Sequence, residues 1–160
     1  MIFITLGSQK FQFNRLLEEV DKLVENLKIS NDIFAQTGYS DYIPKNFEYK
    51  NFLSREEFQE LSNKSDLIIT HGGTGAIVGA LKKSKRVIAV PRLPKYGEHI
   101  DEHQTEIIEE FEKSDLIVGC YDVRDLKEAI DKALNKKIVL YKSNTTTIID
   151  SIDFFINTRN

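Results

Sequence analysis

The segment Asp66-Leu-Ile-Ile-Thr-His-Gly-Gly-Thr-Gly75 joins a short apolar run to a loop that contains three glycines. The apolar run is typical of a buried strand, and apolar residues with helical spacing follow the loop at Ala76, Ile77, Ala80 and Leu81. Glycines allow a backbone to approach a ligand closely, and a helix start supplies free N–H groups and a positive dipole end. The segment therefore predicts a strand, a loop suited to a diphosphate, and a helix. A tight turn that binds nothing is the alternative that these residues leave open.

The rest of the chain repeats this alternation of strands and helices. Strands are also expected at residues 1–6, 33–35, 47–53, 86–90 and 116–118. Helices are expected at residues 16–27, 101–113, 123–135 and about 144–157, and from Ser54, which can form a capping box with Glu57. Apolar strands that alternate with helices favour a mostly parallel sheet covered on both faces. We therefore predict an α/β fold, a Rossmann-like doubly wound sheet, in a single domain of residues 1–160.

Composition narrows the class of protein. A chain of 160 residues with 41% apolar residues has the size and core of one globular domain. A net charge of −3 disfavours binding to nucleic acid. The single cysteine, Cys120, allows no internal disulfide and fits a reducing compartment. The start lacks the features of a signal peptide, and no apolar run is long enough to span a membrane, so a membrane role would require a partner.

Another glycine turn, Thr5-Leu-Gly-Ser8, follows the first expected strand, so it is the first glycine turn along the chain and residues 71–75 form the second. In a parallel sheet the carboxyl ends of the strands share one edge, so Gly7 and Ser8 should lie beside the second glycine turn. Their N–H groups would then meet the same ligand. Taken singly, the turn also fits an ordinary connection between a strand and a helix.

Polar side chains crowd the segment from Pro91 to Gln104. Asp101 and Gln104 suit the vicinal hydroxyls of a sugar, and Arg92 or a histidine would offset phosphate charge. A metal site at His99 and His103 is an alternative, although no third histidine or thiolate accompanies them. A solvated helix start is another, and it explains the acidic residues but neither the two histidines nor the glutamine.

The motifs His71-Gly-Gly-Thr-Gly75, Val87-Ile-Ala-Val-Pro91 and His103-Gln104 together resemble the C-terminal domain of glycosyltransferase family 28. The resemblance covers most of the chain. Within the family, the chain is similar to the small subunits of split enzymes: the dolichol-pathway UDP-GlcNAc transferase and, in more detail, bacterial capsular or exopolysaccharide β-1,4-galactosyltransferases. The resemblance implies the C-terminal half of a GT-B enzyme.

The resemblance also implies a site for a UDP-sugar. The two glycine loops would face the diphosphate, Phe52-Leu53 the uracil, and His103-Gln104 the donor sugar. With Arg92, the expected substrate-binding residues are Gly7, Ser8, Phe52, Leu53, His71, Gly72, Gly73, Thr74, Gly75, Arg92, His103 and Gln104. One position departs from the family: Gly79 stands where many relatives carry a glutamate for the ribose. We expect close packing to be the reason for this glycine.

The function that the resemblance implies is inverting transfer of a hexose, galactose by the more detailed similarity, from UDP to a lipid-linked saccharide in capsule or exopolysaccharide synthesis. Candidates for the general base are Glu98, His99 and Asp101, and neither a metal nor another cofactor is expected. A membrane-anchored partner would supply the acceptor cleft and bring the chain to the cytoplasmic face of the membrane, with the helix at 144–157 as a docking element. A non-catalytic nucleotide-binding or activating subunit remains an alternative. Half of a sugar-nucleotide epimerase is weaker, because the chain lacks a second nucleotide-binding lobe.

Overall fold

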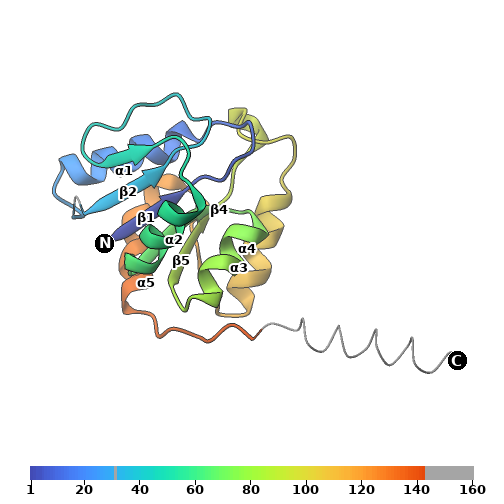
Figure 1. The fold of residues 1–160 in the computed structure, drawn as a ribbon. Coiled ribbons are helices and arrows are strands. Elements are labelled where there is room, and N and C mark those ends of the chain that lie inside the picture. Colours follow the sequence, from blue (N-terminus) through green and yellow to red (C-terminus); the bar gives the residue numbers. More distant parts are fainter. Residues whose placement is uncertain (31, 143–160) are drawn as a thin grey trace, which may run out of the picture.

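The computed structural model describes residues 1–30 and 32–142, and in them a sheet of six strands lies between two layers of helices (Figure 1). The strands lie in the order β3-β2-β1-β4-β5-β6, and every pairing between neighbours is parallel. The elements are β1 (Ile2–Thr5), α1 (Asn14–Glu25), β2 (Ile33–Gln36), β3 (Glu48–Lys50), α2 (Arg55–Lys64), β4 (Leu67–His71), α3 (Thr74–Lys82), β5 (Arg86–Val90), the 3₁₀ turn η1 (Pro94–Tyr96), α4 (His103–Lys113), β6 (Val118–Gly119), the 3₁₀ turn η2 (Val123–Asp125) and α5 (Leu126–Asn135).

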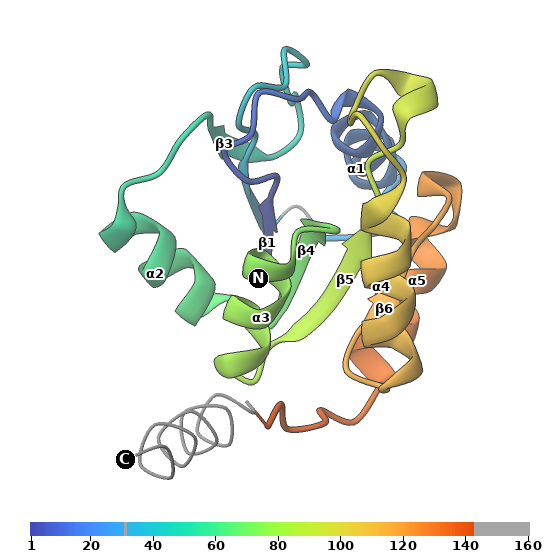
Figure 2. The ribbon, with the colours of Figure 1, turned by 90° about the vertical axis from the view of Figure 1, so that its right-hand side faces the viewer.

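Alternate residues of the central strands feed two separate cores. Ile4, Ile69 and Ile88 face α1 and α5, where they pack with Leu16, Leu17 and Ile130. Phe3, Ile68 and Val87 face α2, α3 and α4, where they pack with Ile77, Leu81 and Ile108. Figure 2 shows the two layers from the side. Because both faces are covered, the central strands β1, β4 and β5 are apolar almost throughout, as the sequence predicted, whereas β3 at the edge is exposed.

The strand order reverses between β1 and β4, which pair with each other at the centre of the sheet. In open parallel sheets, ligands bind at the carboxyl edge near such a reversal. Both glycine turns leave the sheet there, after β1 and after β4. This edge of the sheet is therefore the candidate ligand site.

The predicted Rossmann-like doubly wound sheet is confirmed. The capping box is also confirmed, since the Ser54 Oγ accepts from the Glu57 N–H at 3.1 Å and the Glu57 carboxylate from the Ser54 N–H at 2.8 Å. The element limits differ in detail: the helix expected from residue 101 begins at His103, and η2 precedes α5. The helix expected at about 144–157 lies outside the described residues. None of the helices in residues 1–30 and 32–142 combines the length and apolar character needed to cross a membrane.

Candidate functional site

The two glycine turns meet at the side chain of His71, the last residue of β4. A Cβ added to Gly7 would lie 2.7 Å from the His71 Cε1, and one added to Gly73 would overlap the His71 Nε2. Gly7 also has a φ of +72°, in the left-handed region that glycine adopts easily. Both positions therefore require glycine, and both turns lie on the same rim of the sheet.

The imidazole between the turns is neutral at neutral pH. His71 is buried, and this burial, with a smaller contribution from the charge of Arg92, lowers its pKa from 6.5 to about 4. The ring accordingly supports the two turns by packing and adds no positive charge to the rim. Any attraction for an anion must come from main-chain N–H groups and from other side chains.

The first turn of α3 leaves such N–H groups open. Its N-cap residue is Gly73, and no side chain caps the helix. The N–H groups of Ala76 and Ile77 both donate to the Gly73 carbonyl, whereas those of Thr74 and Gly75 precede any intrahelical partner. Thr74 and Gly75 are exposed. An uncapped helix start with its dipole thus faces the rim beside Gly7.

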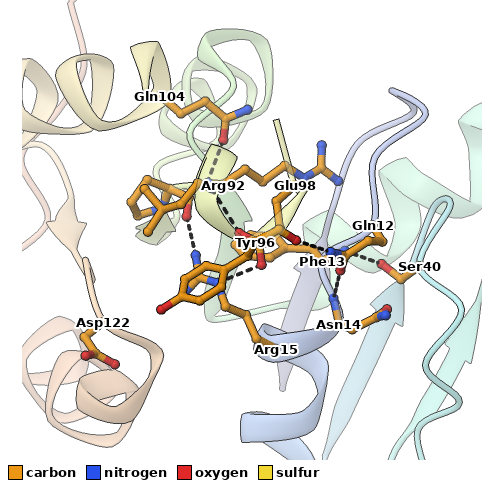
Figure 3. A network of polar contacts seen from close by, with 12 residues as sticks. Gln12, Phe13, Asn14, Arg15, Ser40, Arg92, Tyr96, Glu98, Gln104 and Asp122 are labelled. Carbon is orange, nitrogen blue, oxygen red and sulfur yellow. Dashed lines mark hydrogen bonds and ion pairs between the residues drawn. The ribbon is translucent and has the colours of Figure 1, made fainter. Parts of the chain in front are cut away.

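Gln104 ties the second glycine turn to the neighbouring elements. Its Oε1 accepts from the N–H of Gly72 and from the N–H of Arg92, each at 3.1 Å. A Cβ on Gly72 would lie only 2.5 Å from the Gln104 Cβ. Figure 3 shows the Gln104 oxygen turned towards Arg92. Its neighbour His103 is 67% exposed and pairs with Glu106 at 3.1 Å, so the two residues of this pair have different surroundings.

Arg92 lies beneath the first glycine turn and not on its solvent side. Its side chain is 0% exposed, and its Nη2 donates to the carbonyl oxygens of Leu6 at 2.7 Å and of Phe11 at 3.2 Å. Desolvation lowers its pKa to about 10, so the guanidinium is still protonated at neutral pH. Arg92 was expected among the substrate-binding residues, but its buried side chain contacts the main chain next to Gly7.

The three candidates for a general base have different surroundings. Glu98 is 1% exposed, and its two oxygens accept from the Arg15 Nε at 2.7 Å and from the Leu93 N–H at 3.0 Å. Because one oxygen is held in an ion pair and the other by a main-chain N–H, this geometry argues against Glu98 as the base. The His99 Nδ1 lies 3.0 Å from the Asp101 Oδ1, and the His99 ring packs on Phe11. A histidine oriented by a carboxylate therefore remains.

A cavity of about 510 Å³ opens between α2 and α3, next to the glycine loop. Its wall includes Leu53, one of the two residues expected at the uracil, whereas Phe52 is half-exposed and packs edge-on against the ring of Tyr39. The lining residues are Thr5, Leu53, Ser54, Arg55, Phe58, Gln59, Ser62, Ile68, Gly75, Ala76, Gly79, Ala80 and Lys83. None of them is acidic. The size and the mixed lining suit a nucleoside.

Gly79 lines this cavity, and the reason expected for it is wrong. A Cβ at Gly79 would meet no atom within 4 Å, so close packing does not require a glycine there. The α2 wall, with Arg55 and Gln59, was not predicted. The capping box at Ser54 predicts that α2 begins directly after Leu53. Which face of α2 lies against α3 depends on packing between distant segments, and the sequence pattern does not predict it.

The mostly buried His99 and the exposed His103 pair separately, His99 with Asp101 and His103 with Glu106. Within residues 1–30 and 32–142, no three or more His, Cys, Asp or Glu side chains gather closely enough to hold a metal ion. The alternative of a metal site at His99 and His103 therefore has no assembled ligand set among these residues.

Comparisons with known proteins bear on this site. A curated relative, the UDP-N-acetylglucosamine transferase subunit ALG13 of Kluyveromyces lactis, is 30% identical over 125 residues. The aligned region is 77% of this chain and 55% of the relative, so the chain spans little more than half of that protein's length.

Two solved structures have the same fold. The solution structure of ALG13 has a TM-score of 0.62 at 16% identity and covers 94% of this chain and 93% of that one. The crystal structure of Acinetobacter baumannii MurG has a TM-score of 0.61 at 18% identity and covers 93% of this chain and 48% of that one. The model of the family described as "Glycosyltransferase family 28 C-terminal domain" matches residues 1–153. The chain therefore belongs to the glycosyltransferase family 28 C-terminal domain family, as its motifs indicated.

Proposed function

We propose that the chain binds the donor of a glycosyl transfer, a UDP-sugar, at the carboxyl edge of its sheet. One observation carries the proposal: two glycine turns close on a neutral histidine beside an uncapped helix start. Open N–H groups and a helix dipole are suited to a diphosphate. The adjacent cavity of about 510 Å³ between α2 and α3 offers space for the nucleoside.

The chemical role of this edge is to stabilise the departing UDP. When the acceptor hydroxyl attacks the anomeric carbon, the bond from that carbon to the diphosphate oxygen breaks and negative charge grows on the diphosphate. The main-chain N–H groups of Thr74 and Gly75, which have no intrahelical partner, are the donors that we assign to this charge. We therefore propose transfer with inversion and without a metal cofactor. Transfer that persists in EDTA supports this point, and transfer that stops until Mg²⁺ or Mn²⁺ is restored contradicts it.

His99 is the residue that we assign to proton removal from the acceptor. The His99 Nδ1 lies 3.0 Å from the Asp101 Oδ1. In the tautomer that carries its proton on Nδ1, this nitrogen donates to Asp101, and Nε2 holds a lone pair for the acceptor hydroxyl. Asp101 orients the ring and stabilises the imidazolium that forms. Glu98 has no part in this step, because both of its oxygens are engaged.

We further propose that a second, membrane-anchored subunit supplies the acceptor cleft for a lipid-linked saccharide at the cytoplasmic face of the membrane. The chain spans 55% of the length of its curated relative, and that relative is named a subunit of a UDP-N-acetylglucosamine transferase. The transferred hexose is galactose in our proposal, from the similarity to capsular and exopolysaccharide galactosyltransferases.

Calorimetric titration of the purified chain tests donor binding. We expect UDP to bind, UDP-galactose to bind more tightly than UDP-glucose and UDP-GlcNAc, and dinucleotides such as NAD to give no heat. Tighter binding of UDP-GlcNAc would move the specificity to that of the named relative and contradict galactose. Absence of heat with all four UDP compounds would overturn donor binding.

A transfer assay separates a catalytic from an activating subunit. Membranes from cells that lack this chain supply the partner and the acceptor, and purified chain is added with radiolabelled UDP-galactose. We expect label in the lipid extract with the wild-type chain and little label with Gly73→Asp. We expect His99→Gln to give much less label than wild type, although its UDP affinity should be unchanged. If both variants restore full transfer, the chain is not the catalytic donor subunit.

A further inference from the structure

One buried side chain joins both ends of the first glycine turn, and the chemistry proposed above does not use it. The Nη2 of Arg92 donates to the Leu6 carbonyl at 2.7 Å and to the Phe11 carbonyl at 3.2 Å. These carbonyls flank residues 7–10, of which Ser8, Gln9 and Lys10 are exposed. A single guanidinium thus closes the base of an otherwise solvent-facing turn. Figure 3 shows its side chain running from the end of β5 towards Gln12 and Phe13.

The main chain of the same residue connects to the second turn. The Arg92 N–H and the Gly72 N–H share the Gln104 Oε1, each at 3.1 Å. The end of β5 therefore holds the first turn through a side chain and the second through one glutamine. The relative placement of the two turns depends on this short network.

Core stability does not explain why this residue is an arginine. The Nε and Nη1 of Arg92 are buried and have no hydrogen-bond partner among the described residues. The neighbouring carboxylate, Glu98, is already paired with Arg15. Burying incompletely paired charge is unfavourable, and the two donors without a partner add to this cost. The arginine at this position therefore needs an explanation other than the stability of the core.

The charge lies where an anion is expected. Burial leaves Arg92 protonated at neutral pH, and the ring of Phe13, 5.6 Å from the guanidinium carbon, shields it on one side. Poorly compensated positive charge under Gly7 acts in a medium of low dielectric constant, where it extends further than on the surface. Its field adds to that of the α3 start on the same rim.

We propose that Arg92 is a positioning residue that holds the first glycine turn, and the positive field under it, in the state that a nucleoside diphosphate requires, without touching the donor. The ligand part of this inference rests on the proposed function. The mechanical part, that Arg92 restrains residues 7–10, does not.

The test compares Arg92→Met, Arg92→Lys and a matched control, Arg86→Met, which makes the same change at the opposite end of β5. Two quantities are measured: ¹⁵N order parameters of residues 7–10, and the affinity for UDP by calorimetry. In Arg92→Met we expect order parameters to fall from about 0.85 to below about 0.6. We expect UDP affinity to fall about tenfold in this variant, as for loss of a charged hydrogen-bond donor. Arg92→Lys should be intermediate, and Arg86→Met should leave both quantities unchanged.

The outcomes separate this inference from the proposed function. If the wild-type chain binds UDP and both Arg92 variants keep its order parameters and affinity, the role of Arg92 is overturned and donor binding stands. If the wild-type chain does not bind UDP but the turn loosens in Arg92→Met, the restraint stands and the proposed function fails. Should Arg92→Met not fold, Arg92→Lys decides alone, and wild-type values in it overturn the role.

Discussion

The helices α2 and α3 both begin at the carboxyl edge of the sheet, but their first turns are completed differently. At α2 the chain satisfies itself, because Ser54 and Glu57 exchange side-chain and main-chain hydrogen bonds in a capping box. At α3 the N-cap is Gly73, no side chain caps the helix, and the first N–H groups stay open. Capping is worth about 1 kcal/mol. The helices α1, α4 and α5 also begin without a side-chain cap, so a missing cap alone does not mark a site. The start of α3 differs from these in lying beside both glycine turns, and this is where we propose that the diphosphate binds.

The side chains that support the two helix starts also differ: those at α3 are buried, and those at α2 are exposed. Behind α3 lie the buried ring of His71 and the buried guanidinium of Arg92, and Gln104 fixes the loop from α4. The start of α2 has exposed partners, with Lys50 paired to Glu57 at the surface. Rigid support under an open set of donors is how a protein organises an anion site before the anion arrives.

The largest expected effect comes from placing a negative charge at the open start. In Thr74→Asp, an acidic residue enters the first turn of α3, which favours the helix dipole, while its carboxylate repels a diphosphate. We therefore expect unchanged or higher thermal stability together with a loss of UDP affinity of at least about 100-fold, since two charges about 4 Å apart repel by several kcal/mol near a protein surface.

Thr74→Asn, which has the same shape without the charge, is the matched control and should bind UDP within about threefold of wild type, as expected for an exposed substitution that removes no contact. Calorimetry and thermal melts measure both quantities. Equal affinities for the aspartate and asparagine variants would show that the open start of α3 does not meet the diphosphate.

The parts of this comparison differ in how far sequence could predict them. The capping box and the glycine loop are local patterns, so neighbouring residues alone suffice to assign Ser54, Glu57 and Gly73 to helix starts. The support behind α3 depends on contacts between distant segments: Arg92 reaches a carbonyl 86 residues away, and Glu98 pairs with a residue 83 positions earlier. Spacing carries no information on such contacts. Without these contacts, the sequence analysis expected Arg92 to bind substrate and counted Glu98 among the candidate bases, whereas the structure shows both side chains buried.

The buried imidazole behind α3 makes the stability of the protein depend on pH. The pKa of His71 is about 4 in the folded chain and near 6.5 when exposed, so the unfolded chain binds more protons between these values. His71 therefore stabilises the fold fully above pH 6.5, and this contribution, about 3 kcal/mol, is lost as the pH falls from 6.5 to 4.

Urea unfolding of wild type and His71→Asn at pH 7 and pH 4.5 measures this contribution as a difference in how far the free energy of unfolding falls between the two pH values. The stability of the asparagine variant should fall less between the two pH values, because the titrating group is absent. His103→Gln, at an exposed histidine, should show the same fall in the free energy of unfolding as wild type. If His71→Asn also shows the wild-type fall, His71 is not protonated on unfolding in this pH range.

A smaller effect compares the two hydroxyls at the helix starts. Ser54→Ala removes the cap of α2 and should lower the free energy of unfolding by about 1 kcal/mol. Thr74→Ala removes a hydroxyl that caps nothing and should change it by no more than about 0.5 kcal/mol. Urea titrations at pH 7 decide between them. Similar losses in the two variants would contradict the difference in capping from which the comparison starts.

The smallest effect concerns the body of α3, where Gly79 sits in the helix interior with no atom within 4 Å of an added Cβ. Gly79→Ala should therefore raise the free energy of unfolding by about 0.5 to 1 kcal/mol, because alanine restricts the unfolded chain and favours the helix. Gly72→Ala is the contrasting variant: its Cβ would lie 2.5 Å from the Gln104 Cβ, so it should destabilise the protein. Since Gly79 borders the cavity beside α2, a stabilised Gly79→Ala that binds UDP more weakly would show that the open space, and not the fold, is what this glycine provides. A destabilised Gly79→Ala would contradict the open space itself.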